Sequence, residues 1–152
     1  MDSELRALLL GALSDPPRAL EAIRRLSGRQ EAGVAETLFD ACSGSSVRAR
    51  VAALRALQQR AHPLLREALR DACEDESPRV RAIGFASAPI DVEVFLWALA
   101  NDSSHRNRAI ALRRLTEEGQ RSAVRIAASD PHWRVRAALV PLLIPEDAAL
   151  LG

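Results

Sequence analysis

Apolar residues recur along the chain at the spacing expected of amphipathic α-helices. Residues three and four positions apart lie on one face of a helix, so a stripe at this spacing predicts a helix with one buried side. One stripe consists of Leu5, Leu8, Leu9, Ala12 and Leu13, and another of Leu65, Ala68, Leu69, Ala72 and Cys73. The pattern predicts five pairs of short helices, over 3–13 and 16–26, 31–42 and 46–59, 63–73 and 78–88, 91–100 and 104–117, and 120–128 and 131–143.

The second helix of a pair carries boundary signals. A Ser or Asp oxygen can cap the first free amides of a helix, and a proline in the first turn loses no hydrogen bond. This combination occurs at Asp15-Pro16, Ser77-Pro78 and Asp130-Pro131. We expect the second helices to end at Gly28, Pro89, Gly119 and Pro145.

Four Arg-x-Arg motifs mark an internal repeat. Their second arginines, Arg50, Arg81, Arg108 and Arg136, are 31, 27 and 28 residues apart. Three further columns keep these offsets: Leu38, Leu69, Leu96 and Val124; Cys42, Cys73, Ala100 and Ala128; and Leu57, Ala88, Leu115 and Leu143. Columns that share three unequal spacings indicate a structural repeat.

The repeat predicts the fold class. A single helix pair cannot bury its apolar face alone, so adjacent pairs must stack. We therefore expect an all-α, right-handed solenoid of five repeats, over about 3–28, 29–60, 61–89, 90–118 and 119–145, as one domain spanning 1–152. The composition agrees, because 48% of the residues are apolar, only 3% are aromatic, and Ala and Leu, which dominate, favour helix.

Charge and cysteine usage argue against several function classes. The formal net charge of +1 gives no overall attraction for nucleic acid or anionic lipid, although all 21 basic residues are arginines. The acidic start, Met1-Asp2-Ser3-Glu4, is unlike a signal peptide, and no apolar run approaches the roughly 20 residues that span a bilayer. We expect a cytoplasmic protein without a membrane segment.

Cys42 and Cys73 fall in one column of adjacent helices, beyond disulfide reach, and are interpreted as core residues.

No pattern predicts catalysis. The three histidines, His62, His105 and His132, fall at different repeat positions and form no constellation with Ser, Cys or Asp. No Cys/His cluster has the spacing of a metal site. The sequence therefore predicts no cofactor, no metal and no enzymatic activity.

The repeats resemble the HEAT family, specifically its short bacterial variety of about 30 residues. An Asp six positions before an Arg carries the resemblance, in Asp75 with Arg81, Asp102 with Arg108, and Asp130 with Arg136. The resemblance implies that these side chains form a structural ladder through neighbouring turns. In the second repeat Gly44 replaces the Asp, so Arg50 is expected to pair with Asp75 or with nothing.

The first arginine of each Arg-x-Arg points about 200° around the helix from the second. If the second arginines face the stack, the first ones face water. One turn further on, another arginine column runs along the second helices, with Arg25 and Arg114 beside it. The candidate partner-binding residues are Arg24, Arg48, Arg55, Arg79, Arg106, Arg113, Arg114 and Arg134.

The charges differ between the two helices of a pair. The acids of the second helices are chiefly Glu21 and Glu117, whereas the first helices carry Glu4, Glu31, Glu36, Asp40, Glu67, Asp71, Asp91 and Glu93. HEAT-like proteins usually bind on their concave side. The resemblance thus implies a scaffold or adaptor that binds an acidic protein segment on a basic concave face.

Two alternatives stay open for these arginines. They can be merely solvated, or they can contact a nucleic-acid backbone. The near-zero net charge and the lack of aromatic residues for base stacking argue against nucleic acid. Residues 146–152 resemble the start of a further helix without a polar cap, which predicts self-association or continuation through this end.

Overall fold

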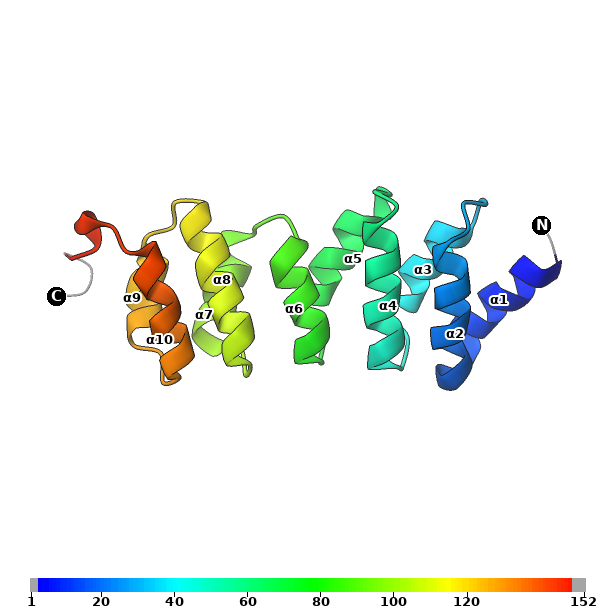
Figure 1. Ribbon diagram of the computed structural model, residues 1–152, viewed down its shortest axis with the longest axis horizontal. Coiled ribbons are helices and arrows are strands. Elements are labelled where there is room, and N and C mark those ends of the chain that lie inside the picture. Colours follow the sequence, from blue (N-terminus) through cyan, green and yellow to red (C-terminus); the bar gives the residue numbers. More distant parts are fainter. Residues whose placement is uncertain (1–2, 149–152) are drawn as a thin grey trace. The chain divides into compact units, whose positions relative to one another are not determined.

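The protein is all-helical over residues 3–148, the part of the chain that a computed structural model describes (Figure 1). This part contains no β-strand. Its helices are α1 (Ser3–Ser14), α2 (Pro16–Ser27), α3 (Val34–Ala41), α4 (Val47–Gln58), α5 (Leu64–Cys73), α6 (Pro78–Ser87), α7 (Val92–Asn101), α8 (His105–Glu117), α9 (Ser122–Ala128) and α10 (Trp133–Leu139), followed by the 3-10 helices η1 (Val140–Leu142) and η2 (Pro145–Asp147).

Every predicted helix corresponds to one observed helix, and the larger differences occur at glycine and proline. Helix α3 begins at Val34 rather than at residue 31, because Gly33 precedes it in the left-handed region with φ of 90°. Helix α10 ends at Leu139 rather than at residue 143, and Pro141, which has no amide hydrogen, lies in the 3-10 turn that follows. The predicted further helix begins as the 3-10 turn η2, and residues 149–152 lie outside the described residues.

The chain divides into two compact units, Met1–Gly84 and Phe85–Gly152, with the boundary inside α6. In the first unit α1 packs on α2 and α3 on α4. Helices of adjacent pairs also pack on one another, α1 on α3, α3 on α5 and α2 on α4. Figure 1 shows α2 and α4 side by side in front of α3 and α5. The first unit is therefore built of two helical layers.

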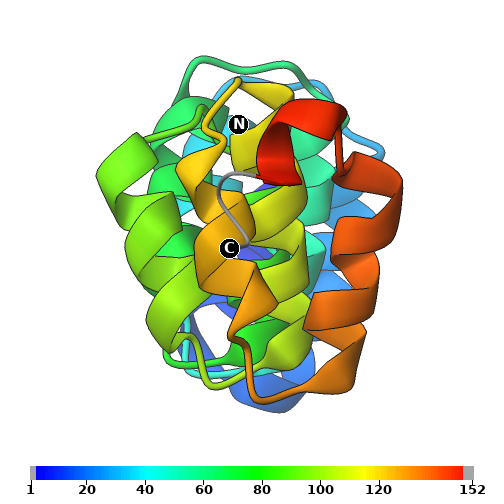
Figure 2. The same cartoon turned by 90° about the vertical axis from the view of Figure 1, so that its left-hand side faces the viewer.

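The second unit repeats this arrangement. Helices α7 and α8 form one pair and α9 and α10 the next, while α7 packs on α9 and α8 on α10. Figure 2 shows α9 and α10, in two shades of orange, side by side. A single domain and a continuous solenoid both depend on how the two units join. Both therefore stay predictions.

The core follows the predicted columns in most positions. The middle residue of every Arg-x-Arg is buried, with exposed fractions of 2%, 1%, 1% and 0% for Ala49, Val80, Asn107 and Val135. Leu38, Leu69 and Val124 are buried as predicted. Leu57, Ala88 and Leu115 are likewise buried in the second helices.

Each of the three predicted columns is interrupted at one or more positions. Leu96 is only half-buried and Ala100 is exposed, because α7 instead buries Phe95 and Leu99. Phe95 packs edge-on against Phe85, with ring centroids 5.4 Å apart. In the last repeat Leu143 is 41% exposed, since α10 ends before it.

Helix α6 approaches α5 closely at Gly84. A Cβ at this position would lie 2.6 Å from the backbone nitrogen of Cys73 and 2.9 Å from its sulfur. Any side chain would push these two helices apart.

We therefore expect Gly84→Ala to lower the free energy of unfolding by about 1–3 kcal/mol through overpacking. Gly28→Ala is the matched control, because a Cβ at Gly28 meets nothing within 4 Å and the residue has a right-handed φ of −87°. Urea unfolding followed by circular dichroism measures both. Equal stability of the two variants would contradict the close approach.

Candidate binding groove

The second arginine of each Arg-x-Arg binds back to its own turn. Its Nη1 donates to the carbonyl oxygen six residues earlier, at 2.9 Å for Arg50, 2.8 Å for Arg81, 2.7 Å for Arg108 and 2.7 Å for Arg136. The aspartate of the turn accepts the amide two residues later, at 2.7 Å for Asp75, 2.8 Å for Asp102 and 2.7 Å for Asp130. These bonds hold the turn that leads into each second helix.

Arg50 and Arg108 also pair with the next turn along the chain. Arg50, whose side chain is 5% exposed, lies 2.8 Å from Asp75, which is the ion pair that the sequence analysis expected. Arg108 holds both carboxylate oxygens of Asp130, at 2.6 and 2.9 Å. Burial is the largest single influence and raises the pKa of Asp130, but the hydrogen bonds from Arg108 and from the His132 amide, together with the nearby positive charge, outweigh it, so the pKa is lowered. These arginines are therefore structural.

The first arginine of each motif faces the opposite way. Arg48, Arg79, Arg106 and Arg134 are all exposed, while the residue between the two arginines is buried. The geometry is that of a helix in which positions two apart lie on nearly opposite sides. One motif thus supplies both a structural and a surface arginine.

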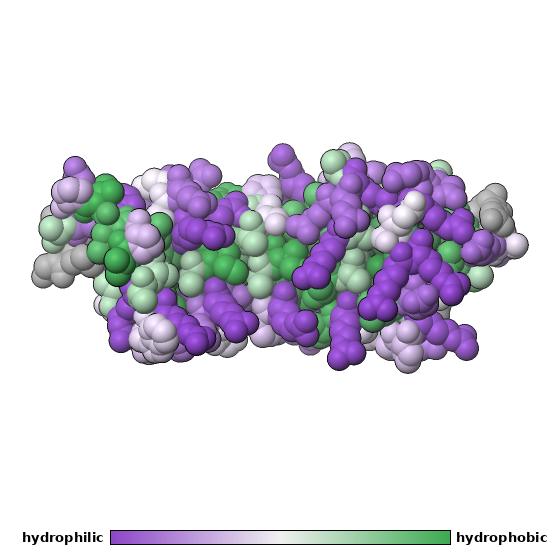
Figure 3. Space-filling view, viewed as in Figure 1, coloured by the Kyte–Doolittle hydropathy of each residue, from purple (hydrophilic) through white to green (hydrophobic). Residues whose placement is uncertain are grey.

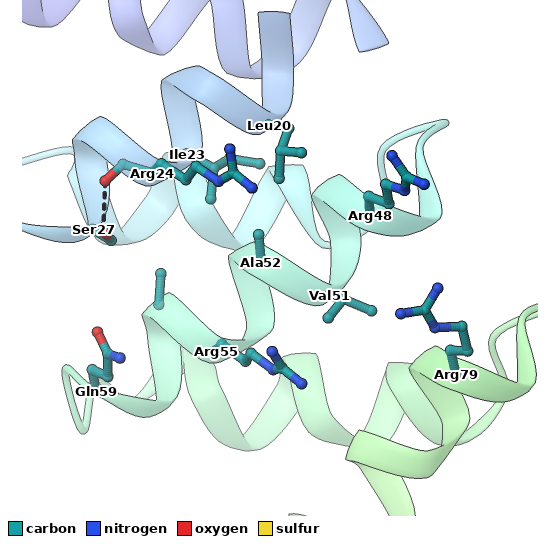
Figure 4. Close-up of a pocket in the computed structure, with 11 residues that line it drawn as sticks. Leu20, Ile23, Arg24, Ser27, Arg48, Val51, Ala52, Arg55, Gln59 and Arg79 are labelled. Carbon is teal, nitrogen blue, oxygen red and sulfur yellow. Dashed lines mark hydrogen bonds between the residues drawn. The ribbon is translucent and has the colours of Figure 1, made fainter. Parts of the chain in front are cut away.

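Four candidate arginines meet in one groove of the first unit. The groove encloses about 400 Å³ between α2, α4 and the start of α6. Figure 4 shows Arg24 on α2, Arg48 and Arg55 on α4, and Arg79 on α6, around Leu20 and Val51. We call these residues and the surface that they surround the arginine groove. The remaining lining residues are Ile23, Ser27, Ala52, Ala56 and Gln59.

The arginine groove is basic at its edge and mainly apolar at its floor. None of the residues that line it is acidic. Within residues 3–148, no side chain pairs with or hydrogen-bonds to the guanidinium groups of its four arginines. In Figure 3 the same face shows hydrophilic side chains over α2 and α4 with hydrophobic surface between them. An anionic ligand would thus find unpaired cations beside apolar atoms.

The candidate arginines of the second unit are engaged differently. Arg113 lies 3.7 Å from Glu117, and Arg134 lies over the ring of Trp133, 5.3 Å from its centroid. Arg114 donates to the carbonyl oxygens of Phe85, Ala86 and Ala88 at 3.0, 2.7 and 3.0 Å. Its guanidinium holds the C-terminal end of α6, so Arg114 is removed from the candidate binding residues.

Two features escaped the sequence analysis. Arg60 donates to the carbonyl oxygens of Leu26 and Arg29, so it holds the end of α2 as Arg114 holds the end of α6. The rings of His105 and His132 stack 3.8 Å apart, although the three histidines were expected to be unrelated. Their separation of 27 residues is one less than the 28 between Arg108 and Arg136, so the two histidines hold neighbouring and not equal positions of the repeat.

The described part of the chain contains no evident reactive group. Burial raises the pKa of the Cys42 thiol to about 12, which keeps it protonated at neutral pH. Cys42 and Cys73 are both free cysteines. Within residues 3–148, no cluster of three or more His, Cys, Asp or Glu residues is arranged to hold a metal ion.

Comparisons with known proteins give no match to a family model, to a curated protein or to a solved structure. No helix in the described part of the chain is long and apolar enough to cross a membrane. The candidate site therefore rests on the geometry of the arginine groove.

We expect Arg108→Met to lower the free energy of unfolding by about 3–5 kcal/mol, because Asp130 would be left buried without its cation. The double variant Arg108→Met with Asp130→Asn should lose less, since no lone charge remains buried. Arg106→Met, two residues away on the exposed side, should change stability by no more than about 0.5 kcal/mol.

Urea unfolding of the three variants checks this order. If Arg108→Met is as stable as the double variant or more stable, the structural role of the Arg108–Asp130 pair is contradicted.

Proposed function

We propose that this chain is a non-catalytic, cytoplasmic scaffold or adaptor with short HEAT-like repeats, which binds an acidic segment of a protein partner in the arginine groove. The observation that carries the proposal is the set of four guanidinium groups around an apolar floor, none of which pairs with another side chain of residues 3–148. Unpaired arginines at an edge favour carboxylate, because the planar guanidinium donates two parallel hydrogen bonds to its two oxygens.

The repeat architecture supports the HEAT-like part of the proposal. Each unit stacks helix pairs in two layers, and the turns before α6, α8 and α10 share one hydrogen-bonding pattern. A right-handed solenoid continues this stacking through both units. In such a solenoid the second helices would line one face, and the arginine groove would be part of it.

The charge balance favours local recognition. The formal net charge of the chain is +1, so long-range attraction for a polyanion is weak. The arginine groove concentrates four positive charges where no acid lines the surface. A short acidic segment matches such a concentrated patch better than an extended polyanion, which would also cross less basic surface.

One observation favours nucleic acid as the second candidate. Trp133 is 61% exposed, and Arg134 lies against its ring. An exposed indole beside arginines is a platform on which a nucleobase can stack. The arginine groove itself, however, has no aromatic lining residue. We therefore rank the acidic protein segment first.

We expect the double variant Arg24→Glu with Arg55→Glu to weaken binding of an acidic peptide at least about tenfold, because both charges at the edge are reversed. A fluorescein-labelled peptide rich in Glu and Leu is the probe, and fluorescence anisotropy is the measurement. The matched control is Arg18→Glu with Arg25→Glu, two exposed arginines of α2 that do not line the groove and that pair with Asp15 and Glu21.

Circular dichroism establishes that both double variants stay helical. Equal peptide binding by the two would place recognition elsewhere. Tighter binding of a labelled single-stranded oligonucleotide, with a steep dependence on salt, would favour the second candidate instead.

A further inference from the structure

The floor of the arginine groove adds information about the partner. Leu20, Val51 and Ala52 are half-buried there, and Ile23 and Ala56 beneath them are only 1% and 3% exposed. Water over this floor contacts aliphatic side chains. Removing apolar surface from water is favourable, and a ligand made only of charges would leave this gain unused.

We infer that the partner segment is amphipathic: its carboxylates meet the four arginines, and apolar side chains between them cover Leu20, Val51 and Ala52. This inference rests on the proposed function and narrows it. Phosphate backbones and acidic tracts without apolar residues lack the apolar side chains that would cover the floor. Because hydrophobic contact and ion pairing then act together, binding should tolerate salt better than binding to a pure polyanion does.

Two peptides of equal charge and length test the inference. Both carry Glu at the same positions, and the remaining positions hold Leu in one and Ser in the other. We expect the Leu peptide to bind at least about tenfold more tightly in fluorescence anisotropy, and Val51→Thr, which keeps the side-chain shape, to reduce that preference.

The outcomes separate the inference from the proposed function. If both peptides bind equally and Arg24→Glu with Arg55→Glu still weakens them, the apolar contact is wrong and the acidic-segment proposal stands. If neither peptide binds the unaltered protein, both fail.

A second inference comes from the histidine pair of the second unit. His105, the first residue of α8, and His132, the residue before α10, have ring planes 3° from parallel and centroids 3.8 Å apart. Nδ1 of His132 accepts the amide of Arg134 at 3.2 Å and so caps α10. Nε2 of His105 is buried without a hydrogen-bond partner. The pair thus joins the starts of two helices that pack together.

Protonation is unfavourable at the ring of His105. A proton on His105 places charge in a confined, basic position: burial, followed by the charges of His132, Arg134, Arg106 and Arg108, lowers the pKa of His105. A second proton would bring two like charges to 3.8 Å.

The carboxylates near the histidine pair already accept hydrogen bonds from other groups. The carboxylate of Asp130 accepts from Arg108 at 2.6 Å and from the His132 amide at 2.7 Å. Asp102, in the turn before α8, accepts the Ser104 amide at 2.8 Å and the side chain of Asn107 at 3.3 Å. The basic groups Arg106, Arg108 and Arg134 therefore dominate the surroundings of the pair.

We propose that the His105–His132 stack is a proton-sensitive latch that fixes α10 on α8 while the ring of His105 is neutral and releases the start of α10 when His105 is protonated. Because the pKa of His105 is lowered by folding, the unfolded chain takes up protons first as pH falls. The latch stabilises the second unit above about pH 6.5, where an unfolded histidine titrates, and this contribution is lost as pH falls through the folded value.

Hydrogen exchange read by mass spectrometry tests the latch at about pH 7.5 and about pH 5.5, after correction for the intrinsic pH dependence of exchange. We expect protection of α10 to fall at least about fivefold more than protection of α4 at the lower pH. Asp130 and Asp147, whose pKa values are lowered, stay ionised across this range.

Three variants make the test specific. His105→Phe keeps a flat ring without a titrating group, and His132→Asn keeps a capping acceptor; both should remove the response of α10. His62→Asn is the control, because Nδ1 of His62 also accepts a helix amide, that of Leu64 at 3.3 Å, but in the first unit; it should leave the response intact. An α10 response that survives both His105→Phe and His132→Asn rules the latch out.

Discussion

The hydrogen bonds of the second arginine in each Arg-x-Arg fix the turns into α4, α6, α8 and α10. The guanidinium closes a loop of six residues onto a carbonyl oxygen, and in Arg50 and Arg108 it also reaches an aspartate of the next turn. Because each of these guanidinium groups is bonded to its own turn, and that of Arg50 is also buried, this geometry sets where α4, α6, α8 and α10 start. The position of the exposed arginines then follows from the helical period.

The arginine groove is a consequence of this arrangement. Helices α2 and α4 pack side by side, so the arginines one turn along each of them face the same surface. Small residues such as Ala52 and Ala56 between them leave the floor open. Arg24 and Arg55, which supply charge at the edge, are 31 residues apart, and so are Leu20 and Val51, which supply aliphatic surface at the floor. Both features therefore recur together in adjacent repeats.

Much of the fold could be predicted from the sequence, because the same residue pattern recurs in several repeats and each occurrence supports the same structure. The helix pairs follow from spacing, and the resemblance to HEAT repeats offered the Arg50–Asp75 pair as one of two expectations for Arg50. The rotation of α7, which buries Phe95 rather than Leu96, depends on how one aromatic ring meets Phe85, and the repeat pattern has no information on this. Arg114 failed as a binding residue for a similar reason: the free carbonyl oxygens at the end of α6 compete for its guanidinium, and they lie 26 to 29 positions away in the chain.

The two arginines of each Arg-x-Arg are under different constraints. The second one, here called inner, holds a turn, and the first one, here called outer, faces the surface. The inner arginine, such as Arg50, cannot change without disturbing a turn, while its neighbour two positions earlier, such as Arg48, makes no contact that the helix pair needs. Substitution on the outer positions can therefore proceed freely while the architecture is preserved. Chains of this architecture can therefore present different surfaces while they keep the arginine that holds the turn.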